Sequence, residues 1–223
     1  PKTLPQSASA TRQAAPSHEC AQRRPLTPST RRRHRAPAKM GNAMNVSVIS
    51  QVYQSNRQEL LALKKKAEKD GKKTIHREGW EAAEVACSVD ESDRDIHERL
   101  FTLYDKRGND EVPSKPFLSG LATITNNTLE ERIHIALEIW DEKGSGYLSQ
   151  EDVQSCFVSM AKTCEYFGDD RMDFEQLEEL VQSMFDTFDA DLVDLKMKYR
   201  DRIADFAVHP IMEIYLGRQT MDG

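Results

Sequence analysis

A twelve-residue segment, 141–152, constrains the fold of this chain more than any other part of it. It reads Asp-Glu-Lys-Gly-Ser-Gly-Tyr-Leu-Ser-Gln-Glu-Asp. Oxygen-bearing residues recur along it, a glycine stands at position 6 and an apolar residue at position 8, which is the layout of a calcium-binding loop between two helices. The residues that can supply oxygen ligands are Asp141, Ser145, Tyr147 through its backbone carbonyl, Ser149 and Asp152.

Two positions of this loop depart from the usual ligand set. Lys143 stands at position 3, where an oxygen is normal, and an ammonium about 4 Å from a divalent cation costs roughly 2 kcal/mol even at the dielectric of water. Asp152 closes the loop where a bidentate Glu is usual, and its shorter side chain suits magnesium better than calcium. We therefore regard the loop as the one serious candidate for calcium, with magnesium as the alternative ion and a metal-free loop as the competing interpretation.

The helix–loop–helix pattern recurs four times along the chain. Asp105 opens a second loop thirty-six residues before Asp141, a spacing typical of paired loops. An apolar residue at position 8 pairs neighbouring loops through a short strand, and the candidates are Ile75, Val112, Leu148 and, less securely, Met197. The pattern predicts an all-α protein with two pairs of these units, at 45–125 and 126–218, after a disordered basic tail at 1–39.

The other three loops have lost most of their ligands. The first, around 68–79, continues from Asp70-Gly71 into two lysines, and the second has Arg107 at position 3 and Pro116 at its closing position. We expect both to be free of metal. The fourth begins at Asp189 but has no turn glycine, and Asp201 would close it as a thirteen-residue loop if Met197 is the pairing residue.

Apolar residues at helical spacing predict the helices themselves. A capping box at Thr128 and Glu131 opens one of them. We expect helices from 45 to about Lys69, through Trp80 and Val85, from an N-cap near Ser92 to Tyr104, around Phe117 to Leu121, from Thr128 to Ile139, at 150–166, at 173–188, and at 198–208 with a break or kink at Pro210.

Charge divides the chain into two unlike parts. The whole chain carries −6, but residues 1–39 hold nine Lys or Arg and one acid, so the remainder carries about −14. An acidic folded part suits a cation-binding protein. The run Arg31–Arg35 could touch nucleic acid, tubulin tails or acidic lipid, yet a solvated tail is the simpler interpretation and we expect no nucleic-acid partner. No run of eighteen apolar residues predicts a membrane span, and four cysteines without a CxxC pair suit a reducing, cytoplasmic compartment.

Several segments together resemble a known family. They are Ile75–Trp80, Arg99–Asp105, Phe117–Leu121, Thr128–Glu131, Ile139–Asp141, Phe206–Pro210 and Leu216–Gly217. Their order and spacing resemble the neuronal-calcium-sensor branch of the EF-hand superfamily. Within that branch they look most like the calaxin-like group, which includes the EF-hand subunit of the outer-dynein-arm docking complex.

The resemblance implies a calcium-responsive adaptor that is not an enzyme. Such a protein would bind an amphipathic helix or coiled coil of a partner, in the cytoplasm or in the axoneme of a cilium. The apolar residues that we expect to line its groove are Phe101, Leu118, Leu121, Ile135, Phe157 and Met160, for which core packing is the competing interpretation. A metal-independent structural subunit and a regulatory subunit of a phosphatase or kinase remain as alternatives. Neither a phosphate-binding loop nor an HExxH motif occurs in the sequence.

Overall fold

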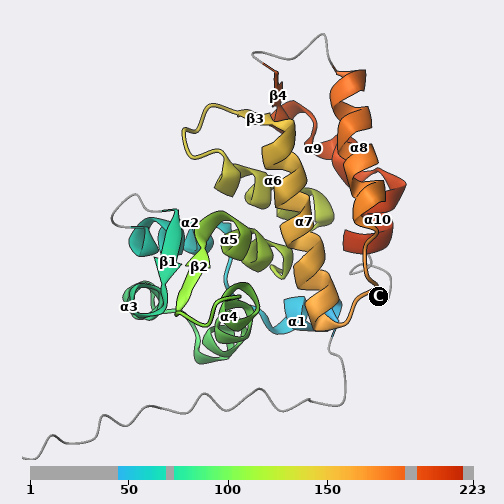
Figure 1. Cartoon of the computed structure of the whole chain (residues 1–223). Helices are drawn as coiled ribbons and strands as arrows, with labels where there is room; N and C mark the ends of the chain where they lie inside the picture. Colours follow the sequence, from blue (N-terminus) through green and yellow to red (C-terminus); the bar gives the residue numbers. More distant parts are fainter. Residues whose placement is uncertain (1–44, 69–72, 189–194, 218–223) are drawn as a thin grey trace, which may run out of the picture. The chain divides into compact units, whose positions relative to one another are not determined.

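The computed structural model describes residues 45–68, 73–188 and 195–217. Most residues in these ranges are helical, and four three-residue strands lie between helices (Figure 1). The first half contains α1 (Val46–Val52), α2 (Arg57–Ala67), β1 (Thr74–His76), α3 (Arg77–Cys87), α4 (Glu91–Tyr104), β2 (Glu111–Pro113) and α5 (Ser114–Thr123). The second half contains α6 (Leu129–Trp140), β3 (Tyr147–Ser149), α7 (Gln150–Phe167), α8 (Phe174–Thr187), β4 (Lys196–Lys198), the 3-10 helix η2 (Tyr199–Asp201), α9 (Ile203–Ala207) and α10 (Pro210–Leu216). The predicted basic tail, 1–39, lies outside the described residues.

The strands pair the loops two by two, as the position-8 residues predict. Strand β1 runs antiparallel to β2 with Ile75 opposite Val112, and β3 runs antiparallel to β4 with Leu148 opposite Met197. All four side chains are buried. The predicted all-α fold of paired EF-hand units is therefore confirmed.

A left-handed backbone turn recurs at the same place in three of the loops. Asp110, Gly146 and Leu195 all have positive φ, and each stands two residues before the residue that pairs the strands. Glycine adopts this conformation freely, whereas Asp and especially Leu are strained there. The turn thus persists where glycine has been replaced, which shows that strand pairing imposes the loop shape.

The helix predicted from 45 to about Lys69 is wrong, because the chain breaks between α1 and α2. Asn56 forms a capping box with Glu59 and starts α2. The buried carboxylate of Asp93 on α4 accepts hydrogen bonds from the backbone N–H groups of Gln54 and Ser55, at 3.0 and 2.8 Å. A partner nearly forty residues away therefore fixes this turn. The N-cap of α4 itself is Asp90, two residues before the predicted Ser92.

The helix predicted at 198–208 is also wrong in its extent. Residue 198 belongs to β4, η2 follows it, and only α9 is α-helical in this range. Pro210 begins the new helix α10 at a position where its missing N–H costs nothing. The capping box at Thr128 and the helices over 150–166 and 173–188 are confirmed to within a residue or two.

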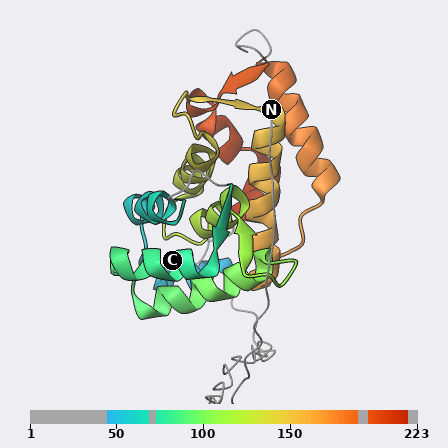
Figure 2. The same ribbon diagram turned by 60° about the vertical axis from the view of Figure 1, so that its left-hand side comes forward.

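Helices α5 and α7 lie against each other across the middle of the described chain (Figures 1 and 2). Gly120 permits this approach, since a Cβ atom there would lie 2.6 Å from Thr163 Oγ1 and 3.0 Å from Tyr104 Cε2. The Tyr104 hydroxyl donates to the Ser159 carbonyl at 2.8 Å and joins α4 to α7. Residues 41–223 cluster as one unit, and the predicted division between 125 and 126 stays a prediction.

Arg132 on α6 is fully buried and binds the ends of two other helices. Its guanidinium donates to the carbonyl of Thr123 at 3.2 Å and to the carbonyl of Leu216 at 2.9 Å. Helix C-termini carry partial negative charge, so both contacts favour the cation. Burial lowers the pKa of Arg132 to about 10, which still leaves it protonated at neutral pH. In the described ranges no helix has the length and apolar character to cross a bilayer.

Candidate metal loop and partner groove

Three of the five predicted metal ligands lie together at the start of loop 141–152. Asp141 ends α6, and its Oδ1 accepts from the backbone N–H of Ser145 at 2.9 Å while Oδ2 accepts from that of Gly146 at 2.6 Å. The Ser145 hydroxyl lies 3.0 Å from Asp141 Oδ1 and 3.3 Å from the Tyr147 carbonyl oxygen. The loop folds back around its first carboxylate, as its sequence predicts.

The other two predicted ligands form a separate pair at the start of α7. Ser149 is the N-cap of this helix, and its hydroxyl accepts from the backbone N–H of Asp152 at 3.2 Å. The same hydroxyl donates to Asp152 Oδ2 at 2.8 Å. The closing carboxylate therefore already has a protein partner, because Ser at position 9 also serves as a helix cap.

The neighbouring hand brings two further residues against this loop. Antiparallel pairing of Tyr147 with Lys198 places Tyr199 across from Gly146. The buried Tyr199 hydroxyl lies 3.5 Å from Asp141 Oδ2, and Arg200 Nε lies 3.4 Å from the same hydroxyl. Burial raises the pKa of Tyr199, so the phenol stays neutral and can donate. Sequence reasoning missed both residues, although the pairing of Leu148 with Met197 fixes their register.

The donor set fits a divalent cation only in part. Calcium requires six to eight oxygens, whereas only five ligand positions of this loop offer one, and only two of those five residues are carboxylates. A bound ion also requires the Ser145 and Ser149 hydroxyls to turn their protons away from Asp141 and Asp152. Over the described ranges, no three His, Cys, Asp or Glu side chains come together as a metal-ligand group. Lys143 is exposed, so its ammonium can point away from the loop.

In the second loop, the arginine Arg77 from α3 binds the aspartate at the turn. Asp105 accepts from the backbone N–H groups of Asn109 and Asp110, which repeats the arrangement around Asp141. Arg77 Nε donates to Asp110 Oδ1 at 2.7 Å, and the Arg77 N–H donates to the Asp110 carbonyl at 2.9 Å. The guanidinium of Arg77 thus balances the charge of the Asp110 carboxylate. Asp70–Lys72 of the first loop and Asp189–Asp194 of the fourth lie outside the described residues.

The six residues predicted to line a partner groove lie in the core of this structure. Each has an exposed fraction of 1% or less, and they are Phe101, Leu118, Leu121, Ile135, Phe157 and Met160. Phe101 packs edge-on against Phe117 with ring centroids 5.5 Å apart, and Phe157 packs in the same way against Phe206 at 5.0 Å. In this conformation they are core residues, and none of them lines the groove described next.

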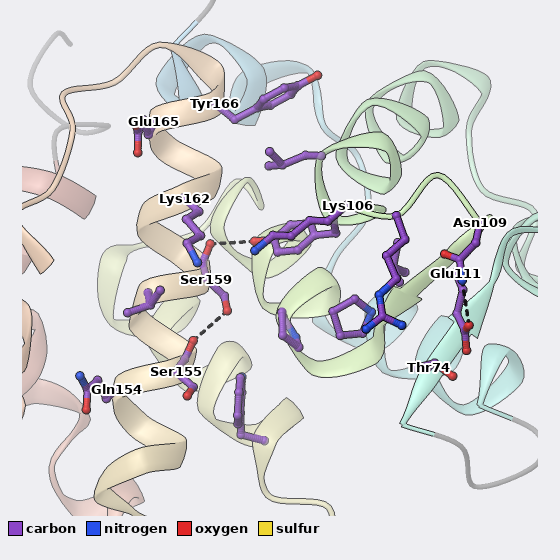
Figure 3. Close-up of a pocket in the computed structure, with 18 residues that line it drawn as sticks. Thr74, Lys106, Asn109, Glu111, Gln154, Ser155, Ser159, Lys162, Glu165 and Tyr166 are labelled. Carbon is purple, nitrogen blue, oxygen red and sulfur yellow. Dashed lines mark hydrogen bonds between the residues drawn. The ribbon is translucent and has the colours of Figure 1, made fainter. Parts of the chain in front are cut away.

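A groove of about 1110 Å³ opens elsewhere, between α7 and the second hand, which consists of α4, β2 and α5 (Figure 3). One wall is a face of α7 that carries Ser155, Val158, Lys162 and Tyr166. The other wall comes from the end of α4, strand β2, the start of α5 and Trp140 at the end of α6. Half-buried apolar side chains form its floor: Leu103, Trp140, Val158 and Tyr166. Sequence reasoning missed this groove, although the helical spacing of the α7 residues is a signal that could have indicated it.

Known proteins with similar sequences are calcium-binding EF-hand proteins of the neuronal-calcium-sensor and recoverin type. Calcium-binding protein NCSA of Dictyostelium discoideum is 29% identical over 130 residues, which cover 55% of this chain and 69% of that protein. A recoverin family protein of the same organism is 25% identical over 95 residues, or 41% of this chain and 42% of that protein. Guanylyl cyclase-activating protein 2 of Lithobates pipiens is 24% identical over 99 residues, or 43% of this chain and 50% of that protein. No model of a protein family matches the chain.

Proposed function

We propose that this chain is a calcium-sensor-like EF-hand adaptor that binds a helix or coiled coil of a partner protein. The observation that carries the proposal is the groove of about 1110 Å³ on a scaffold of paired EF-hand loops. Its floor holds apolar side chains that are only half buried, and contiguous apolar surface of this kind marks interaction sites. The similarity to calcium-sensor proteins supports the same role.

A photo-crosslinking experiment tests the adaptor role directly. p-Benzoyl-phenylalanine is placed at position 158 in the groove, and in a matched protein at position 85, where Val85 on α3 is 65% exposed. We expect a discrete crosslinked protein from position 158 and none of the same size from position 85. Equal crosslinking from both positions, or none from position 158, would overturn the adaptor role.

Calcium responsiveness is the second part of the proposal, and it rests on loop 141–152. A bound ion would neutralise the carboxylates of Asp141 and Asp152, with Ser145, Tyr147 and Ser149 as the other ligands that the loop can supply. Because the donor set is incomplete, we expect a dissociation constant for calcium no tighter than about 10⁻⁴ M, the range of weak EF-hand-like sites. Magnesium is the alternative ion, because Asp152 offers one oxygen more readily than two.

Titration calorimetry with each ion separates a sensor from a metal-independent structural subunit. The double variant K143D/D152E restores an oxygen at position 3 and a bidentate group at position 12, so we expect it to bind calcium at least tenfold more tightly. Asp141→Ala added to that variant should abolish the gain. If the wild-type protein gives no heat at millimolar calcium, the sensor role is refuted and the structural alternative stands. The contact of Tyr199 with Asp141, supported by Arg200, favours that alternative.

A regulatory subunit of an enzyme is the third candidate function. The name of Guanylyl cyclase-activating protein 2 describes a protein that activates an enzyme, which favours this possibility for a relative of it. If the protein crosslinked at position 158 is a cyclase, phosphatase or kinase, its activity is measured with and without the full chain. A change in that activity favours the regulatory role, and an unchanged activity favours a scaffold.

We further propose a cytoplasmic location, with the axoneme of motile cilia and the outer-dynein-arm docking complex as the first site to test. The segments Ile75–Trp80 and Phe206–Pro210, which resemble the calaxin-like group, support this proposal. A fluorescently tagged full chain expressed in multiciliated cells should colocalise with outer-arm dynein. A signal confined to the cell body would refute the axonemal proposal.

A further inference from the structure

We infer that the groove between α7 and the second hand takes an acidic amphipathic helix, with apolar side chains on one face and carboxylates along its edge. The inference rests on the proposed adaptor function and names the chemistry of the partner. It also assigns binding to a surface other than the six core residues that the sequence predicts. Size, lining and charge each contribute to it.

The size of the groove suits a segment of protein. Pockets for small molecules usually hold about 300 to 1,000 Å³, and this one holds about 1110 Å³. Its apolar floor is spread along α7 from Val158 to Tyr166, which are eight residues or about 12 Å apart along the helix. An amphipathic helix presents apolar residues at positions i, i+3 or i+4, and i+7 over a similar length.

Two cations of the groove form no ion pair within the described residues, whereas each of its acids has a polar neighbour. Within the described part of the chain, the side chains of Lys106 and Arg107 form no hydrogen bond or ion pair. By contrast, Glu165 lies 3.8 Å from Arg171, and Glu111 lies 3.7 Å from His76 and accepts a bond from Asn109 at 3.4 Å. With Lys162, the lining holds three cations against these two acids, so the net charge that the groove offers to a partner is positive.

A third cation faces these two from the opposite wall. Lys162 extends from α7, and Figure 3 shows it across the groove from the segment that carries Lys106. Burial and then the ammonium of Lys106 lower the pKa of Lys162, and the carboxylate of Glu165 offsets part of this shift. A carboxylate placed between the two ammonium groups would relieve their repulsion.

The positive lining of the groove differs in sign from the folded part of the chain. Residues 40–223 carry about −14, yet three cations and two acids line this groove, which gives a formal net charge of +1. Complementary charge steers a partner and selects its sequence more than it adds raw affinity. We therefore expect an acidic partner to be chosen over a basic one of the same apolar pattern.

Peptide binding to the full chain tests this chemistry. Three fluorescent eighteen-residue peptides are compared by anisotropy: an amphipathic helix with Leu on one face and Glu at its edges, the same helix with Lys for Glu, and a scrambled acidic peptide without an apolar face. We expect the first to bind at least tenfold more tightly than the other two, and to weaken as salt is raised. Equal binding of the Lys and Glu helices would overturn the inference, and so would equal binding of the scrambled peptide.

Charge reversal in the groove provides the matched variants. K106E/R107E should weaken binding of the acidic helix at least tenfold and strengthen binding of the Lys helix. K65E/K196E changes two exposed lysines outside the groove and should leave the affinity for both peptides unchanged. Circular dichroism confirms that each variant is folded. An RNA oligonucleotide or inorganic phosphate that competes with the acidic helix at equal concentration would show a general anion site and would overturn the helix assignment.

The two proposals fail in different ways. If position 158 crosslinks no partner, the adaptor function itself is refuted. If it crosslinks a partner equally well in wild-type protein and in K106E/R107E, the adaptor function stands and the acidic-helix assignment is refuted.

Discussion

Replacing Gly120 by Ala should destabilise this protein, although the same substitution in most helices is stabilising. Gly120 lies within α5, where alanine is intrinsically better than glycine by about 1 kcal/mol. The new methyl group, however, would lie 2.6 Å from Thr163 Oγ1 and 3.0 Å from both Cε2 and the hydroxyl of Tyr104. All three helices that meet here are packed in the core, so the backbone must shift to relieve the overlap.

The two effects can be compared in magnitude. Overpacking a core by one methyl group costs about 1 to 3 kcal/mol, and the propensity gain of about 1 kcal/mol offsets part of it. We expect the free energy of unfolding to fall by about 1 kcal/mol, with the upper end near 2. Urea denaturation measures this change, provided that the slope with denaturant is the same as in the wild-type protein.

Two further variants isolate the cause. Gly79→Ala in α3 adds the same methyl group where no heavy atom lies within 4 Å, so it should stabilise the protein by roughly 0.5 to 1 kcal/mol. Thr163→Ala removes the nearest atom, so Gly120→Ala should cost at least 1 kcal/mol less in that background. The reasoning is refuted if Gly120→Ala is as harmless as Gly79→Ala, or if its cost is the same with and without Thr163.

Other measurements test separate parts of the structure. Burial raises the pKa of Cys164 to about 12 and that of Cys156 further, so at pH 8 iodoacetamide should modify Cys87 well before either, as mass spectrometry of tryptic peptides would show. Burial also lowers the pKa of His134, so the unfolded chain binds a proton first as pH falls below about 6.5. The free energy of unfolding should therefore decrease on acidification through that range, and His134→Gln should flatten the decrease in denaturant titrations between pH 7 and pH 5. Tyr104→Phe, which removes the hydroxyl between α4 and α7, should lower the free energy of unfolding by about 1 kcal/mol, whereas no change would show that this bond adds nothing.

The parts of the fold that sequence predicts well are those fixed by local rules. Ile75, Val112, Leu148 and Met197 identify the paired strands because each stands at the same position of its loop, and the last three follow a left-handed turn by two residues. The capping box at Thr128 needs only residues three apart. Such features depend on spacing along the chain, and a single sequence contains all of that information.

The parts that sequence misses depend on distant partners. The break before Asn56 needs Asp93, which hydrogen-bonds the preceding turn from another helix. Tyr199 and Arg200 reach the candidate metal loop only because β4 lies beside β3. The six apolar residues predicted to line a partner groove are a similar case. The sequence shows that they lie on apolar helix faces, but not whether those faces pack in the core or against a partner.

The groove illustrates how two kinds of information combine. The period of Ser155, Val158, Lys162 and Tyr166 along α7 is visible in the sequence, but the opposite wall comes from residues about fifty positions earlier. The two walls come together where α5 packs against α7, and Gly120 lies at that contact. Any change that spreads α5 from α7 should therefore alter partner binding as well as stability.

The buried guanidinium of Arg132 has a consequence for the order in which this chain folds. Its two acceptors are the carbonyls of Thr123 and Leu216, which are separated by most of the second half of the protein. During synthesis the first is available early, but the second does not exist until residue 216 has been added. An arginine that lacks half of its acceptors is costly to bury, so it should stay in contact with water until then. The final closure of α6 against α5 therefore waits for α10, and a nascent chain stopped before that helix should keep Arg132 accessible to solvent.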